Sequence, residues 1–125
     1  MSLNVLLDSV ILIDHFNGID EGTAYLGQVR GNASISVITR AEVLTGFEAS
    51  DRQKAAMLLD CFPVFELTKP IADLAADLRR AHGWKLPDAF QAVLAQYHHL
   101  RFATRNTKDF PPERYAFVTV PYKNS

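Results

Sequence analysis

Short apolar runs alternate with longer amphipathic segments along this chain, and that order constrains the fold more than any other feature. The short runs are rich in β-branched and aromatic residues, which is typical of strands. They lie at 5–7, 33–38, 64–67, 102–104 and 117–120. The longer segments place apolar residues at the helical spacing i, i+3, i+4, i+7. They lie at 55–62, 71–78 and 90–97, and shorter helices are expected after residue 8 and over 20–30. This alternation predicts an α/β fold with a mainly parallel sheet between layers of helices.

Size and cysteine content bound the classes of protein that remain. A chain of 125 residues without a linker rich in Pro, Gly and Ser is expected to form one domain over 1–125. With 48% hydrophobic and 22% charged residues, the chain is neither disordered nor a coiled coil. Its one cysteine excludes an intramolecular disulfide and a thiolate-rich zinc site. Cys61 falls on the apolar face of the helix expected at 55–62, which predicts a buried structural thiol.

Charge and hydropathy limit where the protein acts. The net charge of −1 gives no overall basic footprint for nucleic acid, although Arg105 and Lys108 could hold a nucleic-acid backbone locally. The apolar run at 3–16 is interrupted by Asp8 and Asp14, is too short to span a bilayer and lacks a basic leader. We therefore expect a cytoplasmic protein that does not enter membranes.

Acidic residues follow the expected strands and point to a site. Asp8 comes directly after the first strand, Glu42 and Asp109 follow the second and fourth, and Asp88 opens the helix that leads to the fourth. Because the carboxyl ends of parallel strands meet at one edge of a sheet, these four carboxylates are expected to converge there. Crowded carboxylates repel one another, and hard divalent cations relieve that repulsion. Oxygen-only ligands favour Mg²⁺ or Mn²⁺, which can activate water and neutralise charge on a phosphoryl group.

Three of these carboxylates also have a purely structural interpretation. Glu42 stands three residues after Thr39, the pattern of a helix capping box. Asp88 follows Pro87 in a first helical turn, where its charge complements the helix dipole. Asp109 fits a turn residue ahead of the next segment. For Glu42 and Asp88, taken alone, the structural interpretation is the better one.

The remaining polar residues of these segments differ in what they imply. Asp8 is hardest to explain structurally, because an ionisable group at the end of a strongly apolar run needs a partner or a function. Asp14 lies in the same segment and is expected to be solvated on the first helix. Asn106 can hold a turn through its side chain.

The order of these motifs resembles the PIN-domain ribonucleases, and within them the VapC-type toxins of bacterial toxin–antitoxin pairs. Four segments carry the resemblance, in the family's order and across nearly the whole chain. They are 6–14 with Asp8, 36–46 with Glu42, 86–89 with Asp88 and 103–110 with Asp109.

The resemblance implies a three-layer α/β/α sandwich that acts as a Mg²⁺- or Mn²⁺-dependent endoribonuclease and hydrolyses RNA phosphodiester bonds. It assigns four carboxylates to the acidic site: Asp8, Glu42, Asp88 and Asp109. Asp8 and Asp88 are its implied metal ligands.

Polar neighbours of the acidic site are implied by the same resemblance. Thr104 and Asn106 match the residues that orient the site, and Ser9 matches its small hydroxyl neighbour. Val10 departs from the pattern, since many relatives carry Asn or another small polar residue there. That departure puts the support of Asp8 in question.

The resemblance also implies partners for the chain. It suggests a homodimer and a cognate antitoxin that covers an apolar groove between the early helices. Candidate groove residues are Phe16, Tyr25, Leu26 and Phe47.

Other function classes remain open. A receiver-like phosphotransfer domain has a similar length, but it needs an aspartate after the third strand, where Leu67-Thr68-Lys69 stands. A dehalogenase-like enzyme needs a second aspartate two residues after Asp8, where Val10 stands. A non-catalytic PIN-like binding module would keep the fold without the activity, and the presence of all four acids argues against it.

Overall fold

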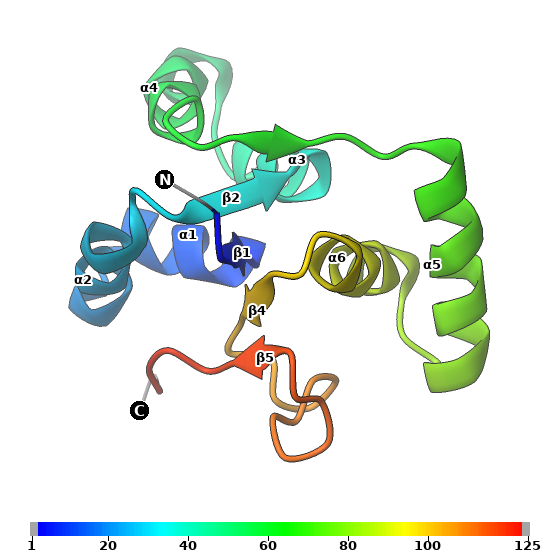
Figure 1. Cartoon of the computed structure of the whole chain (residues 1–125). Helices are drawn as coiled ribbons and strands as arrows, with labels where there is room; N and C mark the ends of the chain where they lie inside the picture. The colour runs from blue at the N-terminus through cyan, green and yellow to red at the C-terminus, as the bar shows by residue number, and fades with distance from the viewer. Residues whose placement is uncertain (1–2, 124–125) are drawn as a thin grey trace.

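Five parallel strands form the central sheet of the computed structural model, which describes residues 3–123 (Figure 1). The first and last two residues of the domain expected over 1–125 lie outside the described residues. In chain order the strands are β1 (Val5–Leu7), β2 (Ala33–Ser36), β3 (Val64–Phe65), β4 (Arg101–Ala103) and β5 (Val118–Thr119). They lie in the order β3-β2-β1-β4-β5, and each neighbouring pair is parallel. The predicted parallel sheet is therefore confirmed. Its order differs from the 2-1-3-4-5 order of a receiver domain.

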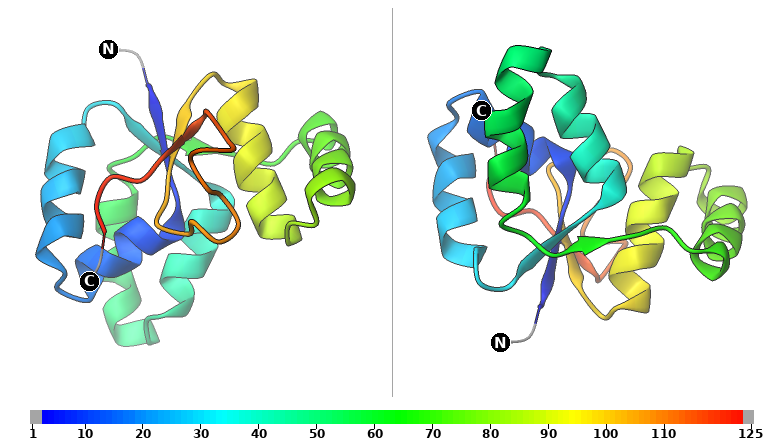
Figure 2. Two further views of the ribbon diagram at one scale, coloured as in Figure 1. Left: turned by 90° about the horizontal axis from the view of Figure 1, so that it is seen from below. Right: turned by 90° about the horizontal axis from the view of Figure 1, so that it is seen from above.

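Helices cover both faces of this sheet, as predicted. They are α1 (Ser9–Phe16), α2 (Asp20–Val29), α3 (Val37–Thr45), α4 (Ala49–Leu59), α5 (Lys69–His82) and α6 (Leu86–Tyr97). Figures 1 and 2 show α5 and α6 on the opposite side of the sheet from α1 and α2. None of the helices within residues 3–123 has the length and hydropathy to cross a membrane.

Alternation along β1 divides the core into two clusters. Leu6 packs with α5, α6 and Phe102, whereas its neighbours Val5 and Leu7 pack with α1 to α4 and Ile35. Successive side chains of a strand point to opposite faces, so a three-residue strand serves both layers. β1 is the middle strand of the sheet, and its carboxyl end therefore lies between the two helical layers.

The boundary between β2 and α3 differs from the prediction. The strand ends at Ser36, and the helix begins at Val37 instead of near Thr39. The reason is a local cap: the Ser36 hydroxyl accepts a hydrogen bond from the Thr39 backbone N–H at 3.2 Å. By contrast, α5 is bounded by the expected signals, with Pro70 in its first turn and Gly83 at its end with a φ of +73°.

One prediction about an apolar helix face is wrong. Cys61 is exposed, because α4 ends at Leu59 and helical spacing no longer places a residue beyond that point. Leu74 and Tyr97 carry the helical apolar pattern but remain 42% and 57% exposed. Helices α5 and α6 pack against each other through other residues. The helical spacing of apolar residues therefore includes positions that are not buried.

Residues 104–117 connect β4 to β5 without a helix and are held by aromatic packing. Phe110 is fully buried and lies 4.8 Å from Trp84, centroid to centroid, and 5.1 Å from Phe102. The Trp84 indole N–H donates to the Asp109 carbonyl at 2.9 Å. These contacts fix a loop that carries residues of the predicted site.

Asp14 is not solvated, contrary to the prediction, but lies in a buried ion pair. It is 3% exposed and accepts two hydrogen bonds from the Arg105 guanidinium, at 2.6 and 2.8 Å. The Tyr122 hydroxyl donates to the same carboxylate at 2.8 Å. Gly22 permits this arrangement, because a Cβ there would lie 3.0 Å from both the Asp14 Cβ and the Tyr122 hydroxyl. The pair ties α1 to the loop after β4.

We predict that Asp14→Asn destabilises the protein by about 2 kcal/mol, because it weakens the charge-assisted hydrogen bonds with Arg105, whose side chain is 22% exposed. Chemical denaturation at pH 7 measures the loss. Asp60→Asn is the matched control, since the exposed Arg40–Asp60 pair has side chains 31% and 66% exposed. It is expected to cost less than about 1 kcal/mol. Equal losses for the two variants would contradict the assignment of Asp14 as a structural anchor.

Candidate active site

Asp8 occupies the centre of the predicted site, at the carboxyl end of β1. It is 8% exposed, and each of its carboxylate oxygens accepts one short hydrogen bond. The Ser9 backbone N–H donates to Oδ1 at 2.8 Å, and the Thr104 hydroxyl donates to Oδ2 at 2.6 Å. Because two donors on different elements fix both oxygens, the carboxylate has a set orientation. A carboxylate oxygen has two lone pairs, so each oxygen can still accept a second ligand.

Thr104 and Asn106 link Asp8 to the fourth predicted acid. The Asn106 backbone N–H donates to the Thr104 hydroxyl at 3.0 Å, which directs the hydroxyl proton toward Asp8. The Asn106 side chain donates to Asp109 Oδ2 at 3.0 Å and accepts from the Asp109 backbone N–H at 3.3 Å. The predicted turn through Asn106 is confirmed. In this turn the Asn106 side chain binds the Asp109 carboxylate, while the Asn106 backbone binds Thr104, which in turn binds Asp8.

Glu42 does not form the capping box that its spacing suggested. That pattern requires Thr39 at the start of the helix, whereas Thr39 lies inside α3 and is fully buried. The Glu42 carboxylate instead accepts a hydrogen bond from the Ser9 hydroxyl at 2.8 Å. Ser9 therefore bridges two of the predicted acids, since its backbone N–H binds Asp8.

Asp88 lies in the first turn of α6, where a structural role as a dipole partner was expected. Among the described residues no hydrogen bond reaches its side chain. Burial, together with the charges of Asp109 and Glu42, raises the pKa of Asp88, and Lys85 opposes that rise. A carboxylate without a fixed partner, surrounded by other carboxylates, has its oxygens available to a ligand.

Electrostatic coupling indicates that the four acids converge. Burial, with the nearby charges of Asp88 and Glu42, raises the pKa of Asp8 from 3.8 to about 6, although Thr104 and Ser9 oppose the rise. Asp109 acts in the same way on Asp88. Like charges that raise one another's pKa are typical of a site built to hold a cation.

The donor chemistry of this site fits a hard divalent cation. Asp8, Glu42, Asp88 and Asp109 supply only carboxylate oxygens, the ligands that Mg²⁺ and Mn²⁺ prefer. Within residues 3–123 no group of three or more His, Cys, Asp or Glu side chains lies close enough together to hold a metal ion. Mg²⁺ is commonly held by one or two carboxylates and several waters, so a pair such as Asp8 and Asp88 is sufficient.

Val10 does not weaken the support of Asp8. Its side chain packs among apolar residues of the cluster that includes Ile11 and Leu12, and the hydrogen bonds to Asp8 come from Ser9 and Thr104.

Arg105, which was expected to hold a nucleic-acid backbone, is paired with Asp14. Both its Nε and Nη2 donate to Asp14, and that carboxylate raises the pKa of the guanidinium. Burial disfavours the charge of Asp14, but the hydrogen bonds from Arg105 and Tyr122 outweigh it and lower the pKa of Asp14. Of the two predicted cations, Lys108 is exposed and unpaired by any salt bridge among the described residues, whereas the Arg105 side chain is 22% exposed and paired.

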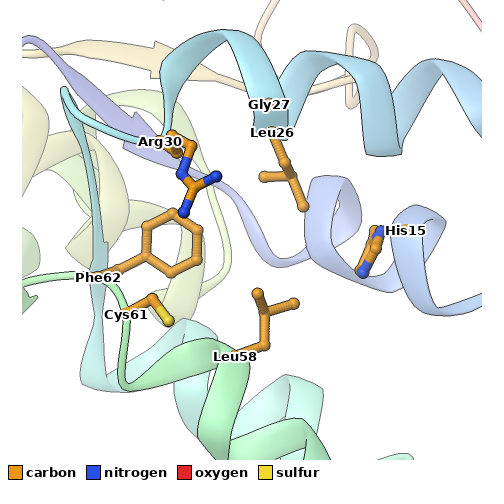
Figure 3. A pocket seen from close by; sticks show the side chains of 7 residues that line it. All are labelled: His15, Leu26, Gly27, Arg30, Leu58, Cys61 and Phe62. Atoms are coloured by element: carbon orange, nitrogen blue, oxygen red, sulfur yellow. The ribbon is translucent and has the colours of Figure 1, made fainter.

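The predicted groove residues line three separate hollows. Leu26 lines a hollow of about 360 Å³ between α1, α2 and the end of α4, together with Leu58 and Phe62 (Figure 3). In the same view His15 and Arg30 stand at its sides. Tyr25 lines a different, shallower depression.

Phe16 and Phe47 line a hollow next to the acidic site, which we call the Glu42 hollow. It is bounded by Ile13, Phe16, Asn17, Glu42, Val43, Gly46 and Phe47. The rings of Phe16 and Phe47 meet edge to face at 4.9 Å. Because Glu42 belongs to both the hollow and the acidic site, a molecule bound in this hollow touches the site.

Sequence reasoning missed two features that organise the site. The Asp14–Arg105 pair joins residues 91 positions apart, and no local pattern signals it. Gln91 is 1% exposed and hydrogen-bonded to both Ser36 and Thr39. Its signal was present in the sequence, since it is the one polar residue in the buried stretch from Ala89 to Ala95.

Comparisons with known proteins agree with this fold. The PIN domain family profile matches residues 5–116. Ribonuclease VapC10 of Mycobacterium tuberculosis is 34% identical over 114 residues, which cover 86% of this chain and 86% of that protein. A toxin–antitoxin complex from Klebsiella pneumoniae contains a chain with a TM-score of 0.89 and 36% identity, covering 97% of this chain and all of that one. FitAcB from Neisseria gonorrhoeae, with a TM-score of 0.75 and 23% identity over 94% and 97% of the two chains, shares the fold.

The raised pKa of Asp8 predicts a specific pH dependence of stability. The folded state holds the Asp8 proton up to about pH 6, whereas the unfolded chain releases it near 3.8. Between these values the folded state binds more protons, so the free energy of unfolding falls as pH rises through this window and stays lower above it. The penalty is on the order of 3 kcal/mol.

Asp8→Asn removes that charge. In metal-free buffer its Tm is expected to exceed that of the parent at pH 7.5, and the difference should vanish near pH 4, where the parent carboxyl is protonated. Thermal unfolding from pH 3.5 to 8 measures this, with the exposed Asp73→Asn on α5 as the control. A lower Tm for Asp8→Asn at pH 7.5 would argue against a strained, buried charge at this position.

Proposed function

Because this chain belongs to the PIN domain family, we propose that it is the toxin of a toxin–antitoxin pair and hydrolyses RNA phosphodiester bonds in the cytoplasm. It acts as an endoribonuclease that requires Mg²⁺ or Mn²⁺. The observation that carries this proposal is the group of mutually coupled carboxylates at the carboxyl edge of the sheet, built around the buried Asp8. The likeness to Ribonuclease VapC10 supports RNA as the substrate.

The residues of the site divide the work of hydrolysis between them. Asp8 and Asp88 would hold the divalent ion, which would neutralise charge at the phosphate and activate water. Asp8 is fixed for this task by Thr104 and Ser9, and Asp88 has oxygens free to bind. Asp109 is kept at the site by Asn106 and adds negative charge that favours the ion.

We assign to Glu42 the transfer of the proton from the attacking water. The Ser9 hydroxyl occupies only its Oε1, so the carboxylate has an oxygen free to accept a proton. In the hydrolysis, the water oxygen forms a bond to phosphorus, the bond from phosphorus to a ribose oxygen breaks, and that oxygen takes up a proton. This hydrolysis requires no oxidant and no reactant other than water.

An antitoxin is the proposed protein partner, and the Glu42 hollow is its proposed contact with the site. The structural likeness to a chain in a Klebsiella toxin–antitoxin complex supports such a partner. An apolar segment seated against Phe16 and Phe47 would reach Glu42 directly, so one binding event could both shield apolar surface and close the site. We further propose that the chain is a homodimer, which light scattering of the purified protein tests.

The nuclease proposal predicts divalent-dependent cleavage of RNA. Purified protein incubated with total cellular RNA is expected to cut it with Mg²⁺ or Mn²⁺ present and to stop on addition of EDTA. Asp88→Asn should lower the rate by about 100-fold or more, because it removes a ligand of the ion. Asp77→Asn on the exposed face of α5 is the control and should retain the parent rate. Cleavage that survives complete chelation would contradict the metal-dependent mechanism, and no cleavage by folded protein of any RNA offered would favour a binding module.

The partner proposal predicts that a substitution in the Glu42 hollow prevents rescue by the antitoxin without removing toxicity. Expressed alone, the chain should slow the growth of a bacterial host, and co-expression with the product of the adjacent gene should restore it. Ile13→Lys places a charge in the Glu42 hollow at a side chain 38% exposed. It should keep the toxicity but lose the rescue. Tyr97→Lys, at an exposed position on α6, should keep both. Full rescue of Ile13→Lys would place the partner elsewhere.

A further inference from the structure

A chain of buried hydrogen bonds runs directly behind the acidic site. The Ser36 hydroxyl donates to Gln91 Oε1 at 2.9 Å, and Gln91 Nε2 donates to the Thr39 hydroxyl at 2.7 Å. The Thr39 hydroxyl donates to the backbone carbonyl of Leu7 at 3.3 Å. The three side chains are at most 1% exposed, so no part of this chain depends on solvent.

Two members of this chain of hydrogen bonds lie close in sequence to carboxylates of the site. Leu7 immediately precedes Asp8, and its carbonyl is the acceptor at the end of β1. Gln91 follows Asp88 by three residues on α6. Residues three apart lie on the same face of a helix, so the Gln91 amide and the Asp88 carboxylate share the face that α6 turns toward β1 and α3.

The same relation holds on α3. Thr39 precedes Glu42 by three residues, so the hydroxyl that receives the Gln91 amide lies one turn from the Glu42 carboxylate. One network therefore connects β1, α3 and α6, the three elements that carry Asp8, Glu42 and Asp88.

The energetics of burial argue that the network does more than fill space. Burying an amide and two hydroxyls is unfavourable unless every polar atom is paired, whereas apolar side chains of the same size carry no such requirement. Among residues 3–123 every buried side-chain nitrogen or oxygen has at least one hydrogen-bond partner, which offsets much of this cost. Hydrogen bonds restrict distance and angle more tightly than apolar contacts, and here they join three segments whose carboxylates repel one another.

We propose that Ser36, Thr39 and Gln91 are positioning residues that fix the separation of the Asp8, Glu42 and Asp88 carboxylates and thereby set the affinity of the site for Mg²⁺ or Mn²⁺. This inference rests on the proposed function, since it assigns a role in the same site. It predicts that losing a hydroxyl in the network alters ion binding, while losing a methyl group of equal size does not.

Thr39 allows the two effects to be separated. Thr39→Val keeps the volume and removes the hydroxyl, whereas Thr39→Ser keeps the hydroxyl and removes a methyl group. Ser34→Ala is the matched control, because the Ser34 hydroxyl is equally buried on β2 and donates to the Val5 carbonyl at 2.9 Å, at the end of β1 away from the site.

The first measurement is Mn²⁺ binding to each folded variant in the absence of RNA, by electron paramagnetic resonance of the free ion. Thr39→Val and Gln91→Met are expected to raise the Kd for Mn²⁺ by about 10- to 100-fold. Thr39→Ser and Ser34→Ala should bind within about 2-fold of the parent, a scatter typical of changes outside a site. Parent-like binding by Thr39→Val overturns the proposal. So does equal weakening in Thr39→Ser or in Ser34→Ala. If Thr39→Val does not fold, Gln91→Met supplies the same comparison.

A second measurement needs neither ion nor RNA and therefore separates this inference from the proposed function. In metal-free buffer at pH 7.5, the Tm of Asp88→Asn should exceed that of the parent, because the substitution relieves repulsion among carboxylates held close together. In the Thr39→Val background the carboxylates can move apart, so at least half of that rise should be lost. An undiminished rise overturns the positioning role. A parent that neither binds Mn²⁺ nor cleaves RNA overturns the proposed function, while this double-mutant cycle still decides the role of the network.

Discussion

The carboxylates at one edge of the sheet repel one another, and the rest of the structure holds them in position against this repulsion. Asp8, Glu42 and Asp88 come from a strand and two helices, and their charges oppose one another in a partly buried space. The protein restrains them in two ways. Thr104 and Ser9 hold the Asp8 carboxylate directly, and two apolar clusters on either side of the sheet hold the elements that carry it. A site strained in this way favours a divalent cation, because the cation removes the repulsion that folding imposed.

The two aspartates of the first strand and helix show how position decides the role of a carboxylate. Asp8 and Asp14 are both buried, and desolvation disfavours the charge of each. Asp14 faces Arg105 and Tyr122, which lower its pKa and make it a structural anchor. For Asp8, burial is the largest cause of its raised pKa, and the charges of Asp88 and Glu42 add to it. The ion pair of Asp14 thus stabilises the fold at one end of α1, whereas the buried charge of Asp8 destabilises it at the other end, where the proposed chemistry takes place.

The loop after β4 connects these two environments. Thr104 donates to Asp8, the next residue Arg105 pairs with Asp14, and Asn106 holds the turn that carries Asp109. Three successive side chains therefore serve the site, the anchor and the turn. Burial of Phe110 against Trp84 fixes the far end of the loop. This explains how a connection without a helix can contribute residues at defined positions.

The sequence by itself predicted the alternation of strands and helices and the parallel sheet, because hydrophobic period is a local property. It also pointed to four acids near strand ends, which in a parallel sheet meet at one edge. It did not determine the hydrogen-bond partners of Asp14 and Glu42 or the exposure of Cys61. Asp14 depends on Arg105, which is 91 positions away, and Glu42 depends on Ser9, which is 33 positions away. Cys61 depended on where α4 ends, and the helix stops two residues earlier. Only the tertiary structure decided these cases, because the partner that pairs or exposes a polar group is brought near it by folding and leaves no local pattern.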